Sequence, residues 1–156
     1  MDNIRFLENK FFYEIIKHIK LALPNVDCAT FNLSTEEEDT KHSFDMVCNV
    51  NFNISVRIRK NKYIKYPDMT IRSKTKNGGK TEIDKIIEGK SQIYFYAFMN
   101  TDENKLKKIR IFNVDAIRKL TNSKKYSERK NNDGSEFYTY LFSDIFKENG
   151  AIYKYN

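Results

Sequence analysis

The chain has 156 residues, 40% hydrophobic and 31% charged, which is typical of one folded domain over residues 1–156. No apolar stretch approaches the ~20 residues of a membrane-spanning helix, and charged residues interrupt the N-terminal segment where a signal peptide needs an apolar core. We therefore expect an intracellular, cytoplasmic protein without a membrane partner. Cys28 and Cys48 are then expected to be reduced, buried thiols. Because there is no CxxC and because His18 and His42 lack ligand spacing, a structural zinc site is not indicated.

The net charge of +7 is concentrated in the middle of the chain. Residues 51–130 contain 21 Lys and Arg against 8 Asp and Glu, whereas the flanking parts are both net acidic. The densest basic stretch, from Arg57 to Lys80, contains a single acid, Asp68. Abundant Lys, Asn, Ile and Tyr are typical of a low-GC genome, but such a bias spreads lysine along the whole chain. The local excess therefore indicates contact with the phosphate backbone of a nucleic acid, with an ordinary solvated surface as the alternative.

The first half of the chain predicts a helix followed by strands. Apolar residues at spacings of three and four predict an amphipathic helix over 3–23, which Pro24 ends. A short strand at Cys28–Leu33 and a polar, acidic loop at Glu36–Asp39 follow. The predicted strands are then Phe44–Val50, Ile54–Arg59 and Met69–Ser73, of which the first two form a hairpin. In the second strand of this hairpin, alternation places Arg57 and Arg59 on the face opposite Ile54, Val56 and Ile58.

The second half begins with a basic loop, Lys74–Lys80, and a short helix. Thr81 is a suitable N-cap, Asp84 stands at the capping-box distance, and Gly89 is a suitable stop. The remaining predicted elements are strands at Gln92–Met99, Lys107–Asn113, Phe137–Phe142 and Ile152–Tyr155, a helix at 115–120, a mobile polar loop at Thr121–Gly134 and a helical turn at Asp144–Lys147. Tyr94, Tyr96 and Phe98 are expected on one face of their strand, with Ile93, Phe95 and Ala97 on the other, so that both faces are covered. The fold class is therefore α/β, a mixed β-sheet flanked by helices, with a core at about 3–120 and a peripheral C-terminal part at 121–156.

The αβββαβ order resembles the core of the PD-(D/E)XK nuclease-like superfamily. In that superfamily an Asp on one strand of a hairpin and an acid-x-Lys triplet on the next strand form the catalytic motif. The matching residues here are Asp45, in Phe44-Asp45-Met46-Val47, and the triplet Arg57-Ile58-Arg59. The segments Thr70–Ser73 and Gly79–Ile86 also resemble those of small phage-type proteins with this fold. The resemblance implies an Mg²⁺-dependent endonuclease or a descendant of one.

Two departures from the motif change what the resemblance implies. Arg57 stands where the superfamily has Asp or Glu, so a cation replaces a metal ligand, and it competes with Mg²⁺ for Asp45. Arg59 stands in place of the Lys and keeps the positive charge in a planar group suited to phosphate. Some members of the superfamily carry the second acid on the following helix, where Glu82 lies here, with Lys85 one turn further. Asp45 paired with an arginine is favoured over a working metal site.

Three functions therefore stay open. The favoured one is a nuclease-like accessory protein of a phage or mobile element that lacks a working metal site. It would bind DNA, RNA or a nucleic-acid-processing complex, and its role would be to inhibit a host defence nuclease such as a CRISPR effector. Its expected nucleic-acid-binding residues are Arg57, Arg59, Arg72, Lys74, Lys76, Gly78, Gly79 and Lys80. The first alternative is an active endonuclease with Mg²⁺ held by Asp45 and Glu82 and with Arg59 and Lys85 at the phosphate. The second is a protein–protein interaction module.

The loop Lys74–Lys80 has a functional interpretation of its own. Gly78 and Gly79 allow the backbone to approach a phosphate, and the helix that begins after Thr81 offers N–H groups to an anion. The loop lacks the GxxxxGK[ST] spacing, so it is not a nucleotide-binding P-loop. An ordinary connection between a strand and a helix is the alternative.

Overall fold

The computed structural model describes residues 3–25, 32–33, 46–48, 52–76 and 78–156. Asp45, Cys28 and the acidic run Glu36–Asp39 lie outside these residues, so the predictions made for them are not addressed. The described residues form an α/β fold with a mixed sheet and a second, antiparallel sheet, which confirms the predicted fold class.

The larger sheet, sheet A, contains six described strands in the order β1-β2-β3-β5-β6-β9. These strands are β1 (Asn32–Leu33), β2 (Met46–Cys48), β3 (Phe52–Arg59), β5 (Ile93–Met99), β6 (Leu106–Asn113) and β9 (Ala151–Tyr155). The predicted hairpin is confirmed, because β2 and β3 pair antiparallel. β3 and β5 lie side by side at the centre of the sheet and run parallel, and the other described pairs of sheet A are antiparallel.

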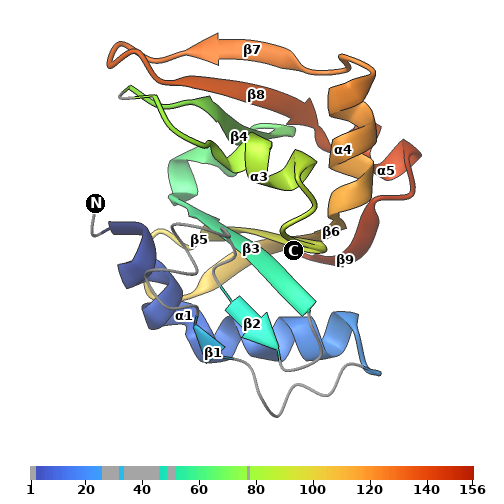
Figure 1. Ribbon diagram of the computed structural model, residues 1–156. Helices are drawn as coiled ribbons and strands as arrows, with labels where there is room; N and C mark the ends of the chain where they lie inside the picture. The colour runs from blue at the N-terminus through green and yellow to red at the C-terminus, as the bar shows by residue number, and fades with distance from the viewer. Residues whose placement is uncertain (1–2, 26–31, 34–45, 49–51, 77) are drawn as a thin grey trace.

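The helix α1 (Asn3–Ala22) covers one face of sheet A (Figure 1). Its buried residues Phe11, Ile15 and Ile19 pack against the strand residues that alternation assigned to this face, among them Ile54 and Phe95. Every residue of β5 is buried, which confirms that both faces of this aromatic strand are covered.

Sheet B and three helices lie on the opposite face of sheet A (Figure 1). Sheet B has the order β4-β8-β7, with β4 (Asp68–Lys74), β8 (Glu136–Leu141) and β7 (Ser127–Lys130). The helices are α3 (Glu82–Ile87), α4 (Val114–Asn122) and α5 (Phe142–Lys147), and a 3₁₀ helix, η1 (Asn61–Tyr63), joins β3 to β4. The second core lies between these layers and contains Tyr94, Tyr96, Phe98 and Tyr140.

Some predicted elements differ from the observed ones. The third strand, predicted at Met69–Ser73, forms, but it pairs with β8 in sheet B and leaves the sheet of the hairpin. The prediction of a loop over 121–134 is wrong at its start, because α4 extends to Asn122, and in its middle, because β7 occupies Ser127–Lys130. Phe142, predicted as the end of a strand, begins α5. The misplacement of β4 follows from its pairing with β8, which is distant in sequence and to which local residue patterns are insensitive. β7 pairs with the next strand along the chain, β8, but all four of its residues are exposed.

Candidate nucleic-acid interface

Arg57 and Arg59 point from β3 toward sheet B. Their strand alternates as predicted, so Ile54 and Val56 are buried against α1 while the two arginines take the other face. The parallel register sets Arg57 beside Tyr96 and Arg59 beside Phe98. Both guanidinium groups therefore lie between the two sheets, close to α3 and β4.

Arg57 forms an ion pair with Glu82. Its Nη1 lies 2.8 Å from Glu82 Oε2, and the two side chains keep only 18% and 23% of their exposure. The same carboxylate oxygen accepts the backbone N–H of Arg72 at 3.2 Å, and Oε1 accepts the hydroxyl of Tyr94. Both oxygens of Glu82 are thus occupied by donors of the chain. The carboxylate contributes to the packing of β3, β4 and β5 against α3.

The ionisation of this cluster follows from its burial. Burial is the largest single influence on Arg57 and disfavours its charged form, but Glu82, Tyr94 and Tyr96 together outweigh it and raise the guanidinium pKa. Burial, and next the negative charge of Glu82, raises the pKa of Tyr94 well above its ordinary value. At neutral pH Tyr94 is therefore a neutral hydroxyl donor, and Arg57 is a cation.

α3 places Glu82 at this position through its first turn. Thr81 is the N-cap, and its hydroxyl accepts the N–H of Asp84 at 3.3 Å, while the Asp84 carboxylate accepts the N–H of Thr81 at 2.8 Å. This confirms the predicted capping box. The box satisfies donors that the sequence suggested for an anion, so the six-residue α3 is not retained as an anion site. Lys85 lies one turn further along the helix.

Arg59 and Arg72 complete a group of three guanidinium groups around β4. Arg59 Nη1 donates to Thr70 Oγ1 at 2.6 Å, and its Cζ lies 4.3 Å from the ring centroid of Tyr63. Arg57 and Arg72 each lie 5.7 Å from the ring centroid of Phe137. The Nε atoms of Arg57 and Arg72 are buried and have no hydrogen-bond partner within the described part of the chain.

The loop Lys74–Lys80 is exposed over most of its described length. Lys74 Nζ lies 3.3 Å from Glu136 Oε1, and Lys80 Nζ lies 2.6 Å from Glu88 Oε1. Lys76 is exposed, and no ion pair to it is found within the described ranges. Gly78 and Gly79 have φ values of +64° and +150°, a region that other residues rarely adopt, so the glycines are required by the turn.

The structure therefore divides the predicted binding residues into two groups. Arg57 and Arg59 donate hydrogen bonds to Glu82 and Thr70. The backbone N–H of Arg72 also donates to Glu82, and its guanidinium contacts the ring of Phe137. Lys74, Lys76, Gly78, Gly79 and Lys80 face solvent or lie in exposed ion pairs. Sequence reasoning missed the partners Tyr94, Thr70 and Phe137. Tyr94 was assigned correctly to the core, but no local pattern indicates that its hydroxyl bonds Glu82.

The predicted metal ligands are only partly described. Glu82 is placed, whereas Asp45 lies outside the described residues. Among the residues that are described, no group of three or more His, Cys, Asp or Glu side chains is arranged to hold a metal ion. The described partners of Glu82 are a cation and two hydrogen-bond donors.

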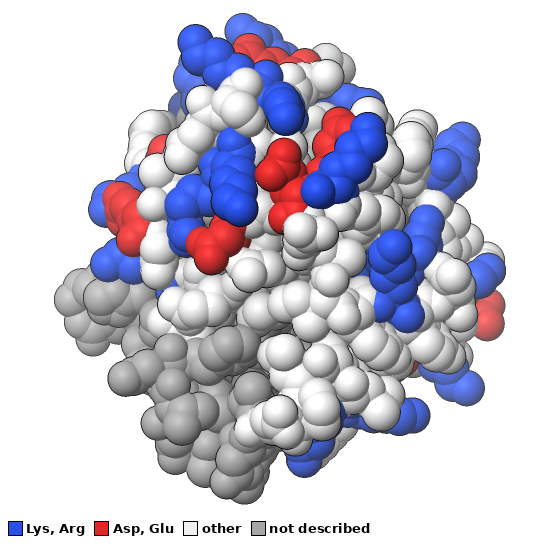
Figure 2. Space-filling model, turned by 90° about the vertical axis from the view of Figure 1, so that its right-hand side faces the viewer, with Lys and Arg blue, Asp and Glu red and all other residues white. Residues whose placement is uncertain are grey.

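A second surface carries charges of both signs. Figure 2 shows Lys and Arg interspersed with Asp and Glu over the upper half of the face that lies at the right of Figure 1. On α5, at the right of Figure 1, Lys147 pairs with Asp144 at 3.4 Å. Ion pairs also form on sheet B, between Arg129 and Asp68 at 3.0 Å and between Lys130 and Glu136 at 3.3 Å. This mixture does not form a continuous basic area.

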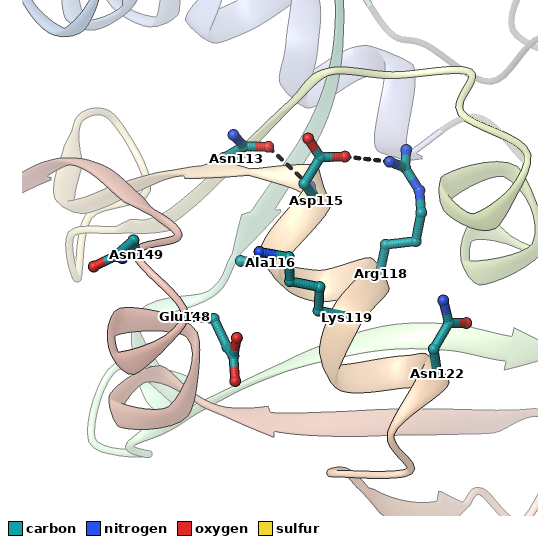
Figure 3. Close-up of a pocket in the computed structure, with 8 residues that line it drawn as sticks. All are labelled: Asn113, Asp115, Ala116, Arg118, Lys119, Asn122, Glu148 and Asn149. Carbon is teal, nitrogen blue, oxygen red and sulfur yellow. Dashed lines mark hydrogen bonds and ion pairs between the residues drawn. The ribbon is translucent and has the colours of Figure 1, made fainter.

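A surface pocket of about 370 Å³ lies between α4 and the residues that follow α5 (Figure 3). It is lined by Asn113, Asp115, Ala116, Arg118, Lys119, Asn122, Glu148 and Asn149. Arg118 donates to Asp115 and, through Nε, to the carbonyl of Ile86 at 3.0 Å. Glu148 lies 3.6 Å from Lys125. Because these charged groups already have partners, the pocket does not supply a converging set of free polar groups.

Comparisons of the chain with protein-family models, with curated proteins and with solved structures found no match. None of the helices in the described ranges is long and apolar enough to cross a membrane.

Proposed function

We propose that this protein binds nucleic acid through a basic surface made by Arg72, Lys74, Lys76 and Lys80, called the β4-loop surface below. The observation that carries the proposal is the guanidinium group of Arg72. It lies over Phe137, and among the described residues no carboxylate or carbonyl accepts a hydrogen bond from it. Because its Nε is buried, the donors that can reach a phosphate oxygen beside the exposed lysine loop are those of Nη1 and Nη2.

The ion pairs of the β4-loop surface do not oppose this function. Lys74 and Lys80 keep about three fifths of their exposure, at 62% and 61%. Exposed pairs contribute only ~0–1 kcal/mol each, so both lysines can exchange a carboxylate for a phosphate at little cost. Binding also releases counterions condensed on the nucleic acid, which favours the exchange at low salt.

Arg57 and Arg59 support this surface from within. Arg59 bonds Thr70, and Arg57 bonds the carboxylate that also accepts the N–H of Arg72. Both contacts fix β4 relative to β3. In this proposal the two arginines hold the binding strand in place and do not themselves contact the nucleic acid.

The bonding of Glu82 favours a binding protein over an endonuclease. A carboxylate that accepts Arg57, Tyr94 and the Arg72 N–H has to lose these bonds before it can coordinate Mg²⁺. The wider part of the proposal is a nuclease-like protein of a phage or mobile element that inhibits a host defence nuclease. It is supported by the sequence resemblance.

Salt-dependent binding tests the proposed function. The affinity for labelled duplex and single-stranded oligonucleotides is measured by fluorescence anisotropy at a series of salt concentrations. The Lys74→Ala/Lys76→Ala/Lys80→Ala variant removes three cations, and each phosphate contact contributes ~0.9 to the log–log slope for duplex and ~0.7 for single strands. We expect the slope to become shallower by about 2.7 for duplex and by about 2.1 for single strands.

The matched control changes the same net charge elsewhere. Lys17, Lys20 and Lys119 are exposed lysines on α1 and α4, and their triple alanine variant should keep the wild-type slope. An equal loss in both variants shows that only net charge matters, and it refutes the β4-loop surface. A wild-type slope near zero refutes nucleic-acid binding itself.

A further inference from the structure

The carboxyl ends of β3 and β5 meet at one edge of sheet A. These strands form its parallel pair, with Arg59 opposite Phe98 near their ends. The chain leaves β3 through η1 and β5 through the turn before β6. In open α/β sheets, ligands bind outside the carboxyl ends of parallel strands, because the connections there diverge. This edge is distinct from the β4-loop surface, since the seven residues of β4 separate the two.

The edge is rich in lysine. Lys60, Lys62 and Lys65 follow β3, and Lys105 and Lys107 lie at the start of β6; all five are exposed. The segment Lys60-Asn61-Lys62-Tyr63-Ile64-Lys65-Tyr66 contains no acid.

The nearby acid Glu103 is already paired. Lys60 Nζ lies 3.4 Å from its carboxylate, and Lys10 Nζ donates to its carbonyl at 2.6 Å. Within the part of the chain that the structure describes, Lys62 and Lys65 make ring contacts only, to Tyr63 and Tyr66. Their ammonium groups thus remain available to an anion.

Tyr66 presents an aromatic ring at the same edge. It is 41% exposed, and its backbone is fixed on both sides. Its N–H donates to the carbonyl of Tyr63 at 3.2 Å, and the carbonyl of Pro67 accepts the N–H of Phe142 at 3.0 Å. Pro67 also restricts Tyr66 to an extended backbone conformation. Little backbone conformational entropy is therefore lost when a ligand contacts this ring.

We infer that this edge binds single-stranded nucleic acid, with a base stacked on Tyr66 and with phosphates contacted by Lys62 and Lys65. An aromatic ring flanked by cations is the arrangement with which proteins hold unpaired bases without sequence preference. In a duplex the bases are stacked on one another, so the ring has no base face to contact. Lys65, 5.5 Å from the ring centroid of Tyr66, lies where it can reach the phosphate beside the stacked base.

This inference rests on the proposed function, because it names the strand state of the nucleic acid bound. It assigns to Tyr66 a preference for single strands, which the lysines of the β4-loop surface cannot supply. Phosphate contacts alone do not favour single strands, because duplex has the higher charge density.

The experiment measures the affinity of wild type, Tyr66→Ala and Tyr66→Phe for a labelled oligodeoxythymidine and for a duplex of equal length. We expect Tyr66→Ala to reduce the single-strand affinity by about 5-fold or more, which corresponds to the lower end of the effect of losing one stacked base. The affinity for duplex should change little. Tyr66→Phe should remain close to wild type. Tyr13→Ala is the matched control, because Tyr13 is 86% exposed on α1 and should not matter.

A second readout is independent of affinity. An oligonucleotide that carries 5-iodouracil is irradiated with the wild-type protein, and the crosslinked peptide is identified by mass spectrometry. Crosslinks at Tyr66 support the inference. Unchanged single-strand affinity in Tyr66→Ala overturns it, as does an equal loss in Tyr13→Ala, and both leave the salt-dependent β4-loop surface standing. Failure of the wild type to bind any oligonucleotide overturns both proposals.

Discussion

Removal of the Glu82 carboxylate should destabilise the protein far more than removal of an exposed acid from the same helix. In Glu82→Ala, the guanidinium of Arg57 loses the partner 2.8 Å away, and its Nε has no hydrogen bond to compensate. The hydroxyl of Tyr94 and the backbone N–H of Arg72 lose their acceptor at the same time. The variant thus leaves one cation and two neutral donors unpaired between the sheets.

The magnitude follows from burial. Breaking a fully buried ion pair by removing one partner costs ~3–5 kcal/mol. The two side chains retain 18% and 23% of their exposure, so water reaches part of the site and lowers this figure to about 2–4 kcal/mol. For a chain of 156 residues, 1 kcal/mol corresponds to ~2–4 °C in the melting temperature. We expect Glu82→Ala to lower it by about 5 to 15 °C.

Glu88→Ala is the matched control. Glu88 lies at the end of α3 and pairs with Lys80 at 2.6 Å, but the side chains are 34% and 61% exposed. Such pairs are worth ~0–1 kcal/mol. Thermal and urea denaturation of both variants give the comparison. Equal losses would show that the Arg57–Glu82 pair is not part of the packing, and the reasoning would then be refuted.

A double variant separates the ion pair from the loss of side-chain volume. In Arg57→Met/Glu82→Leu no charge is left without a partner, and apolar replacement of a buried pair is often neutral. We expect this variant to be more stable than Glu82→Ala. If it is no more stable, the unpaired Arg57 cation is not the main cause of the loss in Glu82→Ala, and the bonds to Tyr94 and the Arg72 N–H, which both variants lack, account for it.

Two further predictions concern the core. Gly150→Ala should cost ~1–3 kcal/mol in urea denaturation, because its Cβ would lie 2.5 Å from that of Ala116 and 2.9 Å from the Ile145 carbonyl. His18 is buried, and burial, with Lys17 second, lowers its pKa. Below pH ~6.5 the unfolded state therefore takes up the proton first, so the free energy of unfolding should fall, and His18→Gln should weaken this fall.

Local patterns predicted the elements whose determinants are local. Alternation in Ile54–Arg59 fixed which side chains face α1, and the spacing of Thr81 and Asp84 fixed the start of α3. The strand β7 was not predicted, because all four of its residues are exposed and their sequence therefore shows no alternation of apolar and polar residues. The place of β4 in sheet B was not predicted, because its partner β8 lies far along the chain, with Asp68 opposite Leu141.

The candidate site was predicted in its residue types but not in its pairings. The sequence offered Asp45 and Glu82 as acids near Arg57, and it favoured Asp45 as the partner of an arginine. The described partner of Arg57 is Glu82, while Asp45 lies outside the described residues. The choice depends on where α3 lies relative to β3, which is set by the packing of Ile83 and Ile86 in the second core. Spacing along the chain carries no information on that packing.

The bonds of Glu82 connect the stability of the fold to the question of catalysis. Coordination of Mg²⁺ by Glu82 needs a free carboxylate oxygen, but Oε2 lies 2.8 Å from the Arg57 guanidinium and Oε1 accepts the hydroxyl of Tyr94. Release of Glu82 would leave that cation in the site, where it repels the metal ion and remains without a partner. The same carboxylate thus cannot hold β4 and α3 together and bind a metal ion at once. Binding of phosphates by Arg72 and the loop lysines does not require release of Glu82, because it leaves the ion pair between Arg57 and Glu82 intact.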